Sequence, residues 1–301
     1  MSSVDDMLRA YDQFDDVGRV MRRAIWLVLG GILSVQFGAA VAKDLFDRIG
    51  PTEMVFLRLV TSTLVFLAIA RPSLRGRSRD DWLVVVGFGL SLGVMNWSIY
   101  EAFSRIPLGL AVTIEFVGPL AIAVVGFRRA RDLVWVGFAA AGVVLLGFQP
   151  AGVTVAGVLF ALLAGAGWGS YILMSASTGA RWPGIDGLAV ASAVATFLLL
   201  PAVLAGQRDL LLDPEILAYG AAVGLLSSVI PYSLELMALR SLKPSVFGIL
   251  MSLEPAAAAL AAIIVLGEFL EPLQWLAMGL VIIASVGATR SGSTIHEPVP
   301  D

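Results

Sequence analysis

A glutamate and a proline interrupt one of the most apolar stretches of this chain. In LGLAVTIEFVGPLA, residues 108–121, Glu115 and Pro119 stand among side chains that are almost all hydrophobic. At the centre of a lipid bilayer a carboxylate costs about 2.5 kcal/mol or more, and a proline removes a backbone hydrogen bond from its helix. Arg58 and Glu254 lie in similarly apolar surroundings. Charged residues in such positions bind substrates, carry protons or pair with one another.

The composition indicates that the chain lies in a lipid bilayer. Hydrophobic residues make up 58% of its 301 residues and charged residues only 14%, whereas soluble proteins are about 25% charged. So few charges cannot cover a water-exposed surface, and the apolar surface must face lipid. The chain has no cysteine, which excludes disulfides, cysteine nucleophiles and cysteine metal ligands. Its net charge of -3 is too small to suggest a nucleic-acid partner.

A helix needs about 20 apolar residues to cross the hydrocarbon core. Ten runs approach this length: 24–42, 51–70, 82–103, 108–126, 132–148, 153–174, 186–206, 215–238, 245–267 and 271–289. Fifteen of the 20 Lys and Arg residues fall on the side of the N-terminus, four fall in the other loops, and Arg58 lies within a run. Because cytoplasmic loops are rich in Lys and Arg, both termini are predicted to be cytoplasmic. The sequence therefore predicts an all-α, multi-pass protein of the bacterial inner membrane with ten transmembrane helices.

Two stretches of the chain share a pattern. The first stretch begins at Asn96 and reads NWSIYEAFSRIPLGLAVTIEFVGPLAIAVV, and the second begins at Pro231 and reads PYSLELMALRSLKPSVFGILMSLEPAAAAL. An offset of about 136 residues aligns Pro119 with Pro255. Five helices per repeat reverse the direction of the chain, so the two repeats have inverted topology, as in many secondary transporters. The predicted organisation is a tail at 1–23, repeats at 24–147 and 153–289, and a tail at 290–301.

Several motifs resemble the EamA family of the drug/metabolite transporter superfamily. They are an arginine in the second helix after Gly50-Pro51, and the run SLEPAAAALAAIIVLGE at 252–268. The stretch IPLGLAVTIEFVGPLA at 106–121 is similar to the threonine/homoserine exporter branch. The resemblance implies an efflux carrier for small metabolites, driven by protons or by exchange. By this resemblance, Glu254-Pro255 corresponds to the family's EP motif and Gly267-Glu268 to its GE motif. The first repeat differs, because glycine rather than glutamate precedes Pro119.

The intramembrane charges are the main candidates for a substrate or coupling site. At 1.5 Å per residue, Arg58 and Glu115 both lie roughly 10 Å below the outer boundary, and Glu254 lies roughly 14 Å from the inner one. Arg58 and Glu115 are therefore expected to pair across a cavity. An amino-acid substrate would offer its carboxylate to Arg58 and its ammonium to a glutamate, and a buried glutamate could carry a coupling proton. The alternative is a structural ion pair between the second and fourth helices that never contacts substrate.

Further polar and aromatic residues lie in the predicted helices. The weaker candidates for the site are Gln36, Asn96, Tyr100, Glu101 and Trp168. Each has a structural alternative, because tryptophan and tyrosine favour membrane interfaces and buried amides bond neighbouring helices. Glu235 is predicted at a membrane boundary and Glu268 in an exposed outer loop.

These residues favour a secondary exporter of amino acids such as threonine or homoserine. A carrier of another metabolite or drug on the same fold remains the alternative, in which Arg58 would be structural. An intramembrane enzyme is not expected, because the spans contain no histidine to act as a general base and no cysteine nucleophile. The predicted coupling ion is H+, and no cofactor is expected. One chain would suffice as the transport unit, and a dimer remains an open alternative.

Overall fold

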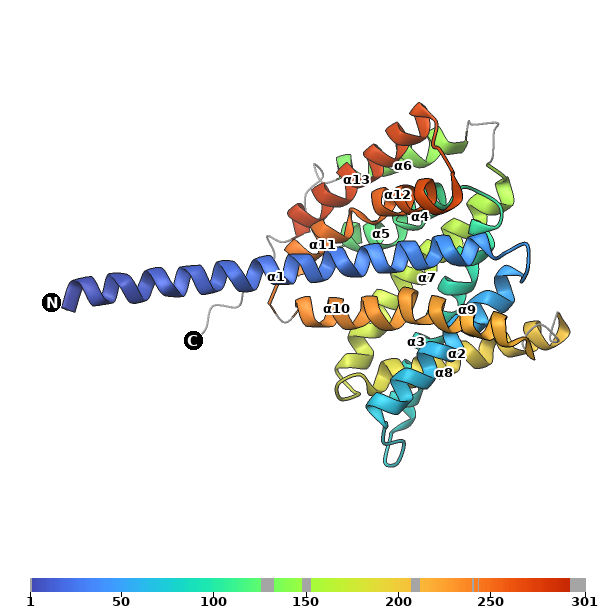
Figure 1. The fold of residues 1–301 in the computed structure, drawn as a ribbon, viewed down its shortest axis with the longest axis horizontal. Helices are drawn as coiled ribbons and strands as arrows, with labels where there is room; N and C mark the ends of the chain where they lie inside the picture. The colour runs from blue at the N-terminus through green and yellow to red at the C-terminus, as the bar shows by residue number, and fades with distance from the viewer. Residues whose placement is uncertain are drawn as a thin grey trace.

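The computed structural model describes residues 2–125, 133–147, 153–206, 212–239, 241–242 and 244–292, and every secondary-structure element among them is a helix (Figure 1). Seven helices run without interruption: α1 (Ser2–Asp44), α2 (Pro51–Ala70), α3 (Arg79–Phe103), α6 (Leu133–Gly147), α7 (Val155–Gly179), α8 (Asp186–Ala205) and α13 (Pro272–Gly292). The remaining elements are the pairs α4 (Leu108–Glu115) with α5 (Val117–Val125), α9 (Pro214–Gly224) with α10 (Ile230–Leu239), and α11 (Pro244–Met251) with α12 (Glu254–Leu266). A π-helical turn, Leu225–Val229, joins α9 to α10.

Eight helical segments in the described part of the chain are long and apolar enough to cross a membrane. Two shorter apolar helices, Leu108–Ile122 and Leu133–Leu145, accompany them. Each of the ten predicted runs coincides with one of these segments. Large hydrophobic side chains are exposed on the outer surface of the bundle, among them Trp26, Phe197 and Ile264. Such a surface suits lipid rather than water.

Local sequence sets where several helices begin. Ser78 caps α3 by accepting a hydrogen bond from the Asp81 backbone N–H, and the Asp81 carboxylate accepts one from the Ser78 N–H in return. This capping box satisfies donors that the first turn of a helix leaves free. Thr154 caps α7 in a similar way, and Pro51 begins α2, where its missing N–H has no cost.

The two halves of the chain interlock. Helix α1 packs against α10 and α12, α3 packs against α7 and α8, α2 packs against α8 and α9, and α6 packs against α13 (Figure 1). The contacts are reciprocal: the first predicted span meets the eighth and ninth, and the sixth meets the third and fourth. The halves therefore share one helical bundle and form one structural unit.

The predicted N-terminal tail is part of a helix. Helix α1 begins at Ser2 and continues without a break to Asp44, so its N-terminal part extends beyond the bundle (Figure 1). Residues 2–20 contain no proline and only one glycine, so little in the sequence opposes helical continuation. At the other end of the chain α13 continues to Gly292, and residues 293–301 of the predicted C-terminal tail lie outside the described residues.

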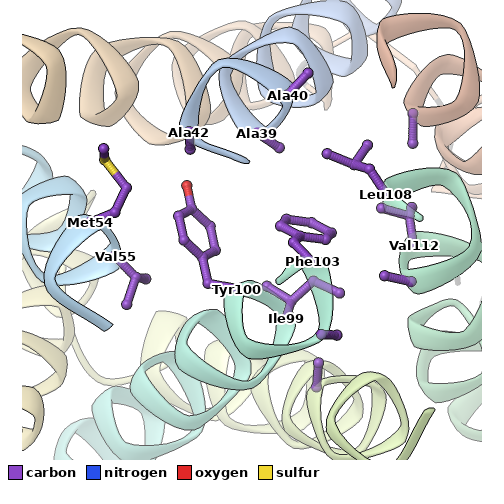
Figure 2. Packing of buried hydrophobic residues seen from close by; sticks show 14 of the residues in the cluster. Ala39, Ala40, Ala42, Met54, Val55, Ile99, Tyr100, Phe103, Leu108 and Val112 are labelled. Carbon is purple, nitrogen blue, oxygen red and sulfur yellow. The ribbon is translucent and has the colours of Figure 1, made fainter. Parts of the chain in front are cut away.

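The centre of the bundle is held by close backbone contacts and by a hydrophobic plug. The plug comprises the residues labelled in Figure 2: Ala39, Ala40, Ala42, Met54, Val55, Ile99, Tyr100, Phe103, Leu108 and Val112. These residues come from α1, α2, α3 and α4 and bury nearly all of their surface. Elsewhere, α5 and α7 cross so closely that a Cβ atom on Gly118 would overlap the backbone of Gly165.

We expect Gly118→Ala to destabilise the protein by about 1–3 kcal/mol, because the added methyl group must displace the α7 backbone. Gly137→Ala is the matched control, since nothing lies within 4 Å of a Cβ atom at that helical position. Thermal unfolding in detergent should show a lower melting temperature for Gly118→Ala alone. Equal melting temperatures for the two variants would contradict the close packing of α5 on α7.

Candidate functional site

A cavity of about 780 Å³ lies between the two halves of the chain. Helices from both halves line it, including α1, α3, α7 and α13 and all three interrupted helices. Six of the eight predicted site residues lie along its wall: Gln36, Arg58, Asn96, Glu115, Trp168 and Glu254. The cavity therefore brings together candidate residues from six of the predicted spans.

Two predicted residues, Tyr100 and Glu101, do not line this cavity. Tyr100 is fully buried in the hydrophobic plug, where its ring packs at 5.6 Å from that of Phe103. The Glu101 carboxylate accepts a hydrogen bond from Thr52 (2.9 Å) and forms an ion pair with Arg105 (2.6 Å). Their positions on α3, one and two residues beyond the cavity-lining Ile99, turn both side chains away from the cavity.

Arg58 does not form the predicted ion pair with Glu115. Its Nε donates to the Ser228 hydroxyl (2.9 Å) and its Nη2 donates to the Ser227 carbonyl (2.8 Å). The reason lies in Pro231, which has no N–H and so leaves the carbonyl four residues earlier without its helical donor. Arg58 supplies that donor at the π-helical turn. Two of its five N–H groups are used in these bonds, and the guanidinium still borders the cavity.

Three carboxylates face the cavity without a partner. Glu115 and Glu254 are 9% and 7% exposed, and Glu235 is half-buried. None of the three has a hydrogen bond or an ion pair with any residue that the structure describes. Glu254 begins α12, where the helix dipole favours a negative charge, and Glu115 is the last residue of α4. The cavity thus places a carboxyl group at the interruption of two of its three interrupted, proline-containing helices.

Amide and hydroxyl groups complete the polar wall of the cavity. Gln36 is 4% exposed, and its side chain has no hydrogen-bond partner in the described part of the chain. The Ser227 hydroxyl is also buried without a partner. Asn96 donates from Nδ2 to the Leu92 carbonyl (2.8 Å), which leaves its side-chain oxygen as an acceptor. Unsatisfied polar groups of this kind are costly unless water or a ligand reaches them.

Aromatic rings also line the cavity. The Trp168 indole meets the Phe116 ring edge-to-face at 5.2 Å, and Tyr171 and Tyr232 line the same cavity. Glu235 also lines this cavity, although the sequence suggested only a boundary position for it. One signal in the sequence could have placed it, because Glu235 lies one helical turn after Pro231 and therefore on the same face.

Glu268 lies in the loop after α12, as predicted, but its side chain is only 23% exposed. Its Oε1 pairs with the Lys43 ammonium (2.5 Å), and its Oε2 accepts a hydrogen bond from the Leu108 N–H (3.0 Å). Lys43 donates a second bond to the Ile106 carbonyl (2.9 Å). Gly267, at φ +65°, ends α12 and turns the chain so that Glu268 can reach these groups.

Two copies of one family model cover most of the chain. The EamA-like transporter family matches residues 22–148 and again residues 155–290. The chain belongs to the EamA-like transporter family. Proteins of this family are transporters, so this EamA protein is not an enzyme.

Full-length relatives of this EamA protein are bacterial exporters. It is 38% identical over 290 residues to the threonine/homoserine exporter RhtA of Escherichia coli (strain K12), covering 93% of this chain and 98% of that protein. It is 40% identical over 279 residues to RhtA of Salmonella typhimurium (strain SL1344), covering 90% and 94%. With these relatives and its eight membrane-length helices, the chain is a multi-pass protein of the bacterial inner membrane.

A solved crystal structure shares the fold. It superimposes with a TM-score of 0.63 at 18% sequence identity and covers 91% of this chain and 99% of the other. At that identity the match establishes only the arrangement of the helices.

Arg58→Met should destabilise the protein by about 2–3 kcal/mol, because the Ser227 carbonyl would then be buried without a donor. Ser228→Ala removes only one of the two bonds and should give a smaller loss. Ser175→Ala is the control, since Ser175 lines the same cavity but donates only within its own helix. The melting temperature in detergent without substrate tests this. A wild-type value for Arg58→Met would show that Arg58 does not hold the π-helical turn.

Proposed function

We propose that this chain is a secondary exporter of small amino acids, of the class of threonine and homoserine. The observation that carries the proposal is a cavity, lined by both halves, in which carboxylates without a protein partner and side-chain amides lie together with the Arg58 guanidinium. A zwitterionic amino acid offers complementary groups to each. The names of the full-length relatives favour the same substrates.

The proposed architecture has ten transmembrane helices in two inverted five-helix repeats, with both termini in the cytoplasm. The double match to one family model and the reciprocal packing of the two halves support it. So does the distribution of Lys and Arg residues between alternate loops. One chain encloses the whole cavity, so a monomer suffices for transport.

The substrate ammonium would bind to Glu115 and Glu254. These carboxylates are buried without partners, so an ammonium group would compensate a charge that is otherwise expensive in this position. The substrate carboxylate would accept bonds from the unused N–H groups of Arg58 and from the Gln36 amide. The aromatic wall around Trp168 would exclude water from the bound amino acid and limit its size.

Transport would follow by alternating access with proton coupling. When the substrate leaves, the buried glutamates lose their cation and would take up protons instead, since an uncompensated charge is costly there. Protonation and substrate binding would then compete for the same carboxylates. Exchange of one amino acid for another would satisfy the same groups without a proton, and no cofactor is needed in either case.

A second candidate is a carrier of organic cations. Three carboxylates against one guanidinium leave the described cavity wall with excess negative charge, and Trp168, Tyr171 and Tyr232 could hold a cation over their ring faces. In that case Arg58 would serve only to hold the π-helical turn. Lysine and a short diamine, offered beside threonine, distinguish the two candidates.

Proteoliposomes test the proposal directly. The wild type should accumulate labelled threonine or homoserine when a proton gradient is imposed. Glu254→Gln or Glu115→Gln should lower this uptake by about 100-fold or more. Both variants should keep the fold, because neither carboxylate forms a bond with the rest of the protein. Glu215→Gln is the control, since this glutamate forms an exposed pair with Arg48 far from the cavity wall. No uptake of either amino acid under any gradient would overturn the proposed substrate class. Full activity in both cavity variants would make the glutamates structural.

A further inference from the structure

The cavity ends at the hydrophobic plug on one side. We call this side the Lys43 end, because α1 finishes there, and the opposite side the Glu235 end. Towards the Glu235 end the lining reaches the last turns of several helices, as at Ser175 and Thr289. Towards the Lys43 end the lining residues Ala39 and Phe103 already belong to the plug (Figure 2).

Beyond the plug, a group of three contacts ties three segments together. Lys43 at the end of α1 pairs with Glu268 at the end of α12, and the two side chains bond the backbone of the turn that precedes α4 through the Ile106 carbonyl and the Leu108 N–H. The Lys43 and Glu268 side chains are only 16% and 23% exposed. We name Lys43, Glu268 and these two backbone groups the latch.

Of the helices that connect the latch to the candidate site, α4 is the shortest. Leu108, which donates to Glu268, is the first residue of α4, and Glu115, which faces the cavity, is the last. A helix of this length moves as one body of roughly 10 Å. A displacement of Glu115 by substrate therefore reaches the latch through α4, and release of the latch frees α4 to move.

The plug contains a group that indicates a second conformation. The Tyr100 hydroxyl is fully buried without a hydrogen-bond partner, and in Figure 2 it points towards Ala42 among apolar side chains. A buried unsatisfied hydroxyl costs about 1–3 kcal/mol. Separation of α1 from α3 would expose this hydroxyl to water and remove that cost, so the closed plug carries a penalty that favours opening.

We propose that Lys43 and Glu268 are positioning residues that close the Lys43 end of the pathway through α4, and that the latch opens in the alternate state of the carrier. The inference rests on the proposed transport function, but it concerns residues that do not line the cavity. An ion pair that also bonds backbone groups is strong enough to hold the closed state and, being noncovalent, can break in each cycle. The exposed pair Arg48–Glu215 also joins the two halves, but its side chains are 46% and 56% exposed, and no bond within the described residues connects it to α4.

A reporter cysteine can detect opening of the Lys43 end without any substrate. The chain has no native cysteine, so Ala39→Cys places one thiol on the cavity wall, one helical turn from Lys43. Inner-membrane vesicles of both orientations are treated with a membrane-impermeant maleimide, and labelling rates are measured from each face. With the latch intact, the thiol should react mainly from the face at the Glu235 end.

Adding Lys43→Met and Glu268→Gln to the reporter should raise labelling from the Lys43 face by about tenfold, within the range typical of coupled states. Arg48→Met with Glu215→Gln should leave both rates unchanged. Lys43→Arg keeps the pair and should restore most of the closure. Retained labelling from the Glu235 face shows that a variant is folded. If the double variant does not fold, Glu268→Gln alone should give a smaller increase in labelling from the Lys43 face, because its side-chain oxygen can still accept a hydrogen bond from the Leu108 N–H.

An unchanged labelling rate from the Lys43 face in folded latch variants would overturn the proposal that the latch closes this end. An equal increase in the control variant with Arg48→Met and Glu215→Gln would also overturn it. Because labelling needs no substrate, a failure of amino-acid uptake in proteoliposomes would overturn the proposed function alone. The two inferences therefore fail separately.

Discussion

The bond between Arg58 and the π-helical turn is the interaction on which the site depends. Pro231 has no N–H and leaves the Ser227 carbonyl without its helical donor, and Arg58 donates to that carbonyl from α2. One contact thus neutralises the cost of a broken helix and fixes a guanidinium at the cavity wall. Interrupted helices near buried charges recur where α4 meets α5 and where α11 meets α12, so the site is built at the points where regular helix fails.

The consequence is an unequal distribution of partners among the buried charges. Arg58 is bonded to the protein, whereas Glu115, Glu235 and Glu254 face the cavity without partners in the described structure. Neutralising any of the three should therefore affect ligand binding more than folding, and removing Arg58 should affect both. A carrier needs this division, because the groups that bind cargo must release it in each cycle, while the framework must persist.

Much of this arrangement could be predicted from the sequence, and its failures have physical causes. The helical segments follow from apolar runs, and most polar candidates reach one cavity because a charged or amide group in such a run must face away from lipid. Tyr100 was misplaced because a tyrosine packs in a core as readily as it lines a site. The Arg58–Glu115 pair was wrong because depth along a helix says nothing of direction around it, and Pro231 offered a closer acceptor. Glu268 was missed as a partner of Lys43 because contacts between distant loop ends depend on the tertiary fold.

The central claim is that the cavity binds an amino acid through its ammonium group. Protection of a thiol at Ile172→Cys, a position on the cavity wall, tests it most directly. Threonine and homoserine should slow labelling of this thiol in the purified protein, and N-acetylthreonine, which lacks the ammonium, should not. Labelling that is indifferent to threonine, or slowed equally by N-acetylthreonine, would contradict the account.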